Sequence, residues 1–229
     1  MTLRSLAQRL RRDRSGVAML EFAMGAPFLL MAGLYGAEMA NYALVNMRIS
    51  QLAEHIADNA SRIGDTSTLQ NRRIYESDLN EVIYGAQLQG GTGLDLYENG
   101  RVIISSVQVS ESDNQYIHWQ RCRGVKNINS DYGSEGADLG TAGIGPEGEE
   151  VLAMPDDALI FVELSYTYQP LVSEKFLGSL DILAIASFMV RDDRDISQIY
   201  QRDPASPDPI QTCNQFKGRA VVGTNGSFS

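Results

Sequence analysis

Histidine and cysteine are scarce in this chain, because 229 residues contain only two of each. Neither Cys122 nor Cys213 has a second cysteine or a histidine at the short spacing of zinc ligands, which argues against a metal site. His55 falls on the polar face of a predicted helix, and His118 lies within a predicted strand. We therefore predict no catalytic, cofactor-binding or metal-binding residue, no small-molecule substrate and no enzyme. A membrane-tethered hydrolase is the weakest hypothesis.

Basic residues are also few outside the first 16 positions. Residues 1–16 contain five arginines and one acid, whereas residues 17–229 contain 14 basic and 28 acidic side chains. Nucleic-acid binding needs cations that displace counterions from phosphates, so the acidic body argues against a nucleic-acid partner. The basic N-terminus is better explained as a topological signal.

One long apolar run follows these arginines. Sixteen residues from Phe22 to Ala37 carry no charge, and the apolar character extends from Val17 to about Val45. A membrane-spanning helix needs about 20 mostly apolar residues, and a buried core helix is rarely so long. Arginines before the run and acids after it predict a cytoplasmic N-terminus. The predicted domains are a cytoplasmic leader, a transmembrane helix, and an extracytoplasmic stalk and head, over residues 1–16, 17–45 and 46–229.

The position of a small residue separates this segment from an ordinary secretory signal, whose cleavage site follows the apolar run. Here Gly16 precedes the run, Glu21 is the fifth residue after it and Phe22 is the sixth. This order resembles the type IV prepilin signal, in which a membrane peptidase cuts after the glycine and the apolar segment is retained. The resemblance implies cleavage between Gly16 and Val17 by a prepilin peptidase.

Glu21 needs its own explanation, because a carboxylate at the edge of hydrocarbon is costly unless a partner offsets its desolvation. Cleavage would free an ammonium group on Val17, four residues earlier. In a filament whose apolar helices bundle, Glu21 of one subunit could pair with the ammonium of a neighbour. Such a pair would set the axial register, as a buried polar group does in a coiled coil. The alternative is that Glu21 merely lies among lipid headgroups.

The stretch "RRDRSGVAMLEFAMGAPFLLMAGLYGAEMANYAL" resembles the start of the TadE-like minor pseudopilins of tight-adherence (Flp) type IVb pilus systems. The shared features include the glutamate–aromatic pair, a proline (here Pro27) and a second glutamate near the helix exit (here Glu38). Later, "ALIFVELSYTYQPLVSEKFLGSLDILAIASFMVR" resembles the strand, the Tyr-x-Pro-Leu segment and the closing strand of that family. The resemblance covers residues 10–62 and 158–191.

This resemblance implies a structural or assembly protein in the bacterial inner membrane, with one membrane pass, a periplasmic head and no cofactor. Its partners would be the prepilin peptidase, other pilins or pseudopilins and the pilus assembly machinery, and it would act within the fibre or at its base. The alternative is a signal-anchored periplasmic binding or envelope-scaffold protein. Glu38, near the opposite membrane interface, is expected to tolerate loss of its charge better than Glu21.

Periodicity predicts an α+β head after the membrane helix. Apolar residues at helical spacing extend the first helix to about Arg62, and "SDLNEVIYGAQLQGG" predicts a further helix. Alternating patterns in "RVIISSVQV", "QYIHWQRC", "ALIFVELSYTYQ" and "DILAIASFMV" predict about four strands. In the third, the residues from Ile160 to Tyr168 place apolar side chains on one face and polar ones on the other, which predicts an antiparallel sheet with one buried face. The glycine-rich, acidic residues 131–150 are predicted to form a loop, without the regular ligand spacing of a Ca²⁺ site.

The two cysteines are predicted to form a disulfide, because an even number outside the cytoplasm usually pairs. The bond would attach the segment "RDPASPDPIQTC", which ends at Cys213, to the strand that ends near Cys122. Closing a loop of about 90 residues is worth about 4–5 kcal/mol in the chain-entropy account of disulfides.

Overall fold

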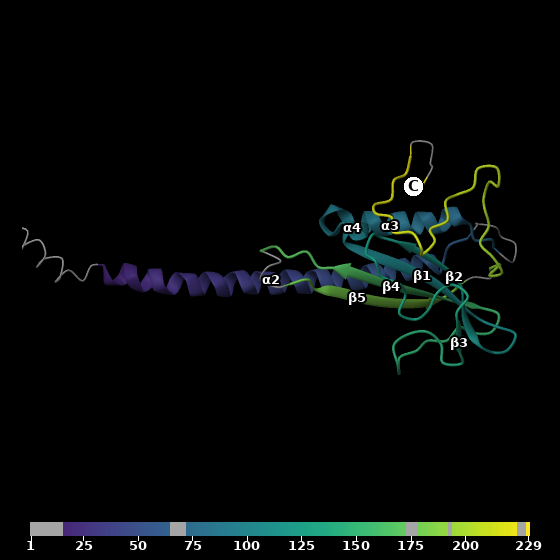
Figure 1. Cartoon of the computed structure of the whole chain (residues 1–229), viewed down its shortest axis with the longest axis horizontal. Helices are drawn as coiled ribbons and strands as arrows, with labels where there is room; N and C mark the ends of the chain where they lie inside the picture. Colours follow the sequence, from purple (N-terminus) through teal and green to yellow (C-terminus); the bar gives the residue numbers. More distant parts are fainter. Residues whose placement is uncertain (1–15, 65–71, 173–177, 192–193, 224–227) are drawn as a thin grey trace, which may run out of the picture.

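The computed structural model describes residues 16–64, 72–172, 178–191, 194–223 and 228–229, so most of the predicted leader lies outside the described residues. It has the predicted α+β fold, in which a long helix carries a head with further helices and an antiparallel sheet (Figure 1). The helices are α2 (Val17–Ala60), α3 (Glu76–Leu94) and α4 (Leu96–Asn99). The strands are β1 (Gly100–Val109), β2 (Gln115–Arg123), β3 (Asp138–Gly140), β4 (Ala158–Thr167) and β5 (Asp181–Met189).

Helix α2 is continuous over 44 residues, as the sequence predicts, and contains Pro27 without ending there. At about 1.5 Å per residue it is about 66 Å long. Its first half extends away from the head, and its second half lies against the sheet (Figure 1). The same helix therefore contributes both an isolated rod and part of the folded core.

The sheet has the order β3-β2-β1-β4-β5, and every neighbouring pair is antiparallel. Helices α2 and α3 cover one face of it and form the main hydrophobic core. On α2, buried residues recur three or four positions apart from Ile49 to Ala60, and the alanines among them allow close approach to the strands. The predicted apolar face of β4 is confirmed, because the alternate side chains on that face belong to this core, namely Ile160, Val162, Leu164, Tyr166 and the following Tyr168.

The prediction of a sheet with one buried face is wrong for β1 and β4, whose two faces are both buried. On the second face, Leu159 and Phe161 of β4 join a smaller hydrophobic cluster. Residues 124–157 supply its cover, including Tyr132, whose ring meets that of Phe161 edge to face at 5.2 Å between centroids, and Ile144. The sequence did not predict this cover, because the apolar residues of this segment are isolated among glycines and acids. The short strand β3 also lies in the predicted loop.

Glu163 lies on this second face and is buried, although the pattern predicted a solvent-facing side chain. Ser130 Oγ donates a hydrogen bond to its Oε2 atom (2.6 Å), and the backbone N–H of Asp131 donates to Oε1 (3.1 Å). Burial raises the pKa of the Glu163 carboxyl, and the hydrogen bond from Ser130 opposes this rise only in part. Ionised Glu163 is therefore a local cost to stability.

We expect Glu163→Gln to stabilise the head by on the order of 1 kcal/mol at about pH 7.5, and this gain should shrink as the pH falls toward about 4. A pKa that is higher in the folded than in the unfolded protein makes the wild type lose stability as the pH rises through the folded-state value. Glutamine carries no charge, its one acceptor oxygen can take the N–H of Asp131, and its amide group can donate to Ser130 Oγ. Thermal unfolding at the two pH values measures the difference, and a gain that does not depend on pH would contradict the explanation.

Candidate functional site

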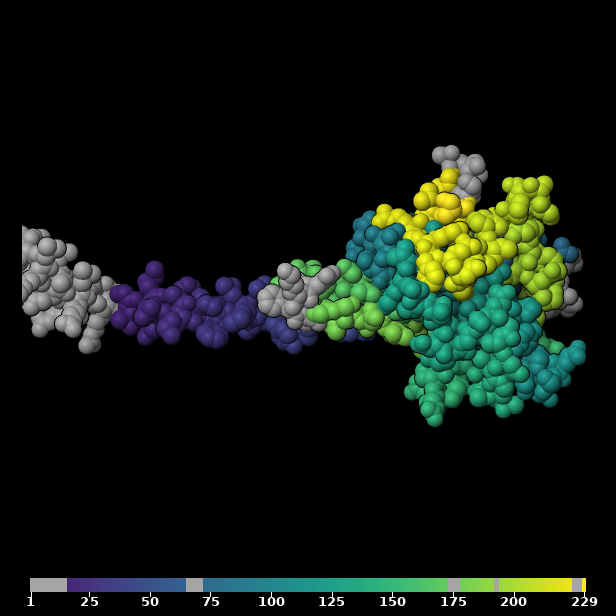
Figure 2. Space-filling model, in the orientation of Figure 1, coloured from purple at the N-terminus to yellow at the C-terminus, as the bar shows by residue number. Residues whose placement is uncertain are grey.

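The first half of α2 is an apolar surface that the protein itself does not cover. Every residue from Val17 to Ala37 is exposed except Ala26, which is half-buried, and the exposed side chains include Phe22, Leu30 and Tyr35. Figure 2 shows this segment as a narrow projection from the head. By length and composition, α2 is the one helix among the described residues that could cross a membrane.

The residues of the predicted processing and assembly site gather at the start of this helix. Gly16 precedes the first turn, and its carbonyl oxygen accepts a hydrogen bond from the N–H of Leu20 (3.0 Å). Glu21 and Phe22 follow in the second turn and are exposed. No residue in the described part of the chain forms an ion pair or hydrogen bond with the Glu21 carboxylate. A counter-charge for Glu21 from a neighbouring subunit stays a prediction.

Glu38 marks the point where α2 enters the head. Its side chain is 2% exposed and is the first buried one along the helix. The Tyr168 hydroxyl donates a hydrogen bond to its Oε1 atom (2.5 Å), and the backbone N–H groups of Leu171 and Val172 donate to Oε1 (3.2 Å) and Oε2 (2.9 Å). We call this set of contacts the Glu38 junction. It joins the helix to the segment that follows β4.

Tyr168 is held from a second side in the Glu38 junction. Asn41 Nδ2 donates a hydrogen bond to the Tyr168 hydroxyl oxygen (2.7 Å), and the Tyr42 ring packs edge to face on the Tyr168 ring at 5.1 Å between centroids. Burial, together with the hydrogen bond to Glu38, raises the pKa of the Tyr168 hydroxyl, so this group stays protonated and donates. The junction is therefore a fully hydrogen-bonded polar cluster.

Sequence reasoning named both halves of this junction without connecting them. It placed Glu38 at a membrane interface, and it noted the Tyr-x-Pro-Leu segment, here Tyr168 to Leu171, as a separate shared feature. The two elements are 130 residues apart in the sequence. The available signals were a carboxylate on an otherwise apolar helix and a tyrosine two residues before a proline. Neither signal indicates that the two side chains are in contact.

A disulfide joins Cys122 at the end of β2 to Cys213, as predicted, and links the C-terminal tail to the sheet. The backbone N–H of Cys122 also donates a hydrogen bond to the carbonyl oxygen of Gln211 (2.8 Å). Disulfides persist in oxidising compartments, so the bond is consistent with a head outside the cytoplasm. Figure 2 shows the tail, in yellow, covering one side of the head.

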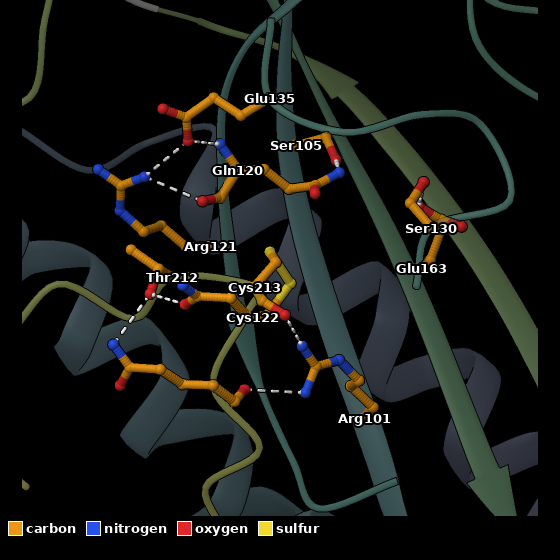
Figure 3. Close-up of a disulfide and its surroundings, with 12 residues drawn as sticks. Arg101, Ser105, Gln120, Arg121, Cys122, Ser130, Glu135, Glu163, Thr212 and Cys213 are labelled. Carbon is orange, nitrogen blue, oxygen red and sulfur yellow. Dashed lines mark hydrogen bonds and ion pairs between the residues drawn. A yellow bond between two sulfur atoms is a disulfide. The ribbon is translucent and has the colours of Figure 1, made fainter. Parts of the chain in front are cut away.

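Two buried arginines strengthen this attachment, and sequence reasoning missed both. Arg101 of β1 donates to the carbonyl oxygen of Cys213 (2.6 Å), as the close-up in Figure 3 shows. It also donates to the carbonyl oxygen of Gln215 (3.1 Å). Arg123 of β2 donates to carbonyl oxygens further along the tail, those of Gly218, Arg219 and Ser229. Guanidinium groups present several donors in a fixed fork, which suits rows of backbone carbonyls. The tail is thus a structural part of the head.

The histidines and acids of the described residues do not assemble into a recognisable catalytic or metal-binding site. His118 lies within hydrogen-bond distance of the Tyr116 hydroxyl (3.3 Å) and the Ser197 carbonyl oxygen (3.1 Å), and His55 lies beside Gln89 (3.2 Å). No group of three or more His, Cys, Asp or Glu side chains that could hold a metal ion occurs within the described ranges. The absence of enzyme activity stays a prediction.

No protein-family model, curated protein or solved structure shows a significant match to this chain.

Proposed function

We propose that this chain is a minor pseudopilin-like assembly subunit of a tight-adherence (Flp-type) pilus. One observation carries the proposal: an apolar helix projects uncovered from a disulfide-bonded head, with Gly16 before its first turn and Glu21, which no described residue pairs with, in its second. In this role, the first half of α2 resides in the inner membrane and then packs among the helices of other subunits. The head lies in the periplasm, and the N-terminus lies in the cytoplasm.

The proposed mechanism is assembly, and no bond-making step is assigned to the head. Removal of the basic leader would free the ammonium group of Val17 at the end of the helix. A charge pair between this group and Glu21 of a neighbour would be buried among apolar helices, where the loss of either partner is costly. Such a pair favours one axial offset between subunits over others.

We expect the mature chain in the membrane to begin at Val17. Glycine at position 16 has no Cβ, so the backbone there is accessible to a peptidase. Mass spectrometry of the purified protein, from cells with and without the prepilin peptidase, measures the N-terminus directly. Retention of residues 1–16 in the presence of the peptidase would contradict the pseudopilin proposal and favour a signal-anchored periplasmic binding or scaffold protein.

A further inference from the structure

The connection after β4 carries two apolar side chains that the protein leaves exposed. Leu171 is 69% and Val172 is 45% exposed. Their backbone N–H groups bind the Glu38 carboxylate in the Glu38 junction, so their position along α2 is fixed. Figure 1 shows this connection reaching along α2 in the direction away from the rest of the head. We call residues 168–172 the β4 tip.

The length of the exposed helix sets the depth of the β4 tip relative to a membrane. From Val17 to Glu38 the helix rises about 32 Å, and the hydrocarbon core of a bilayer is about 30 Å thick. Glu38 is also the first buried residue of α2, so the head begins at a helix position whose distance from Val17 matches the thickness of the hydrocarbon core. Tyr35, one turn earlier and exposed, is of a type enriched at bilayer interfaces. A spanning α2 therefore puts Glu38 at the outer hydrocarbon boundary.

We propose that the β4 tip inserts Leu171 and Val172 into the outer interface of the phospholipid bilayer, as a second membrane contact beside α2. This inference rests on the proposed membrane anchor. Residues 17–229 contain twice as many acidic as basic side chains, so attraction to anionic lipids does not drive the contact. Burial of apolar surface drives it instead, and a zwitterionic phospholipid is a sufficient partner. Helix and tip together fix the orientation of the head on the membrane.

The experiment uses the full chain in vesicles of phosphatidylcholine, with an environment-sensitive fluorophore on a Leu171→Cys variant. We expect a blue-shifted emission, a several-fold loss of fluorescence with quenchers attached near the lipid headgroup, and little loss with aqueous iodide. Leu88→Cys is the matched control, because Leu88 is an exposed leucine on α3. The neighbouring Gln89 contacts His55, which lies 17 residues beyond Glu38 on α2 and so about 25 Å further from the membrane. The control should respond to iodide and not to lipid quenchers.

A second label, on Met24→Cys in the exposed apolar helix, separates this inference from the membrane anchor. Quenching of Met24→Cys by deep lipid quenchers, with Leu171→Cys open to iodide, would overturn the β4-tip proposal and leave the anchor in place. Access of iodide to Met24→Cys would contradict the anchor itself. If Leu171→Cys is shielded from both kinds of quencher, a protein contact covers the tip, and the lipid proposal is wrong.

Discussion

Replacing Glu38 with alanine should destabilise the head, because three hydrogen-bond donors lose their charged acceptor. These donors are the Tyr168 hydroxyl and the backbone N–H groups of Leu171 and Val172. The loss should appear as a fall of several degrees in the melting temperature of the head. Loss of the Glu38 carboxylate would also release the β4 tip from α2.

Two matched variants separate this effect from a general response of the helix. Tyr168→Phe removes one of the three donors and should cost about 1–1.5 kcal/mol. Glu54→Ala changes an exposed glutamate of the same helix and should stay within about 0.5 kcal/mol of the wild type. Because Glu38 and Tyr168 are in direct contact, the double variant should cost less than the sum of the single variants.

Fluorescence of the single tryptophan measures these differences in the detergent-solubilised full chain. Trp119 is buried in the main core, so its emission reports unfolding of the head. If Glu38→Ala and Glu54→Ala have the same melting temperature, the junction does not stabilise the head. That result would also remove the basis for placing the β4 tip at a fixed depth.

The sequence predicted the features of this fold that depend on the local periodicity of apolar residues or on the even number of cysteines. A 44-residue helix, the strands that begin at Gly100, Gln115, Ala158 and Asp181, and the disulfide all follow from such signals. Helical and strand periods are properties of neighbouring residues, so they need no knowledge of the tertiary fold. A chain with two cysteines can form only one intramolecular disulfide, so the pairing followed from their number.

The missed features all depend on contacts between distant segments. Glu163 and Arg101 are polar residues in strands, and a two-residue period assigns such residues to solvent. In the structure, residues 124–157 cover Glu163, and the carbonyl groups of the tail bind Arg101. The expectation that Glu38 tolerates loss of charge considered only a membrane interface. Its burial in the Glu38 junction adds a cost in stability that this expectation did not include.

Glu21→Gln is expected to reduce pilus assembly strongly while leaving the isolated subunit intact. Glu21 is exposed, and no residue in the described part of the chain pairs with it, so folding of the head does not depend on its charge. Glutamine keeps the size of the side chain and costs less than a carboxylate in hydrocarbon. The variant should therefore insert, be cleaved after Gly16 and show a normal melting temperature.

The assembly defect follows from the proposed partner of Glu21. In the bundle, the neighbour's terminal ammonium would lose its counter-charge in a site shielded from water. Removing one member of a buried ion pair costs about 3–5 kcal/mol, which corresponds to a loss of at least about 100-fold in an association constant. Glu21→Asp keeps the charge on a shorter side chain and should retain part of the assembly. Glu54→Gln, on the exposed part of the same helix within the head, should assemble normally.

The measurement scores each variant for its level in the membrane, its N-terminus and the number of surface pili. Normal membrane level and processing with few pili for Glu21→Gln, and partial recovery with Glu21→Asp, would agree with a charge pair between subunits. If Glu21→Gln assembles like Glu54→Gln, the carboxylate lies among lipid headgroups and plays no part in axial register. A variant that fails already at insertion or cleavage would instead place the role of Glu21 in recognition by the peptidase, before any contact with a neighbour.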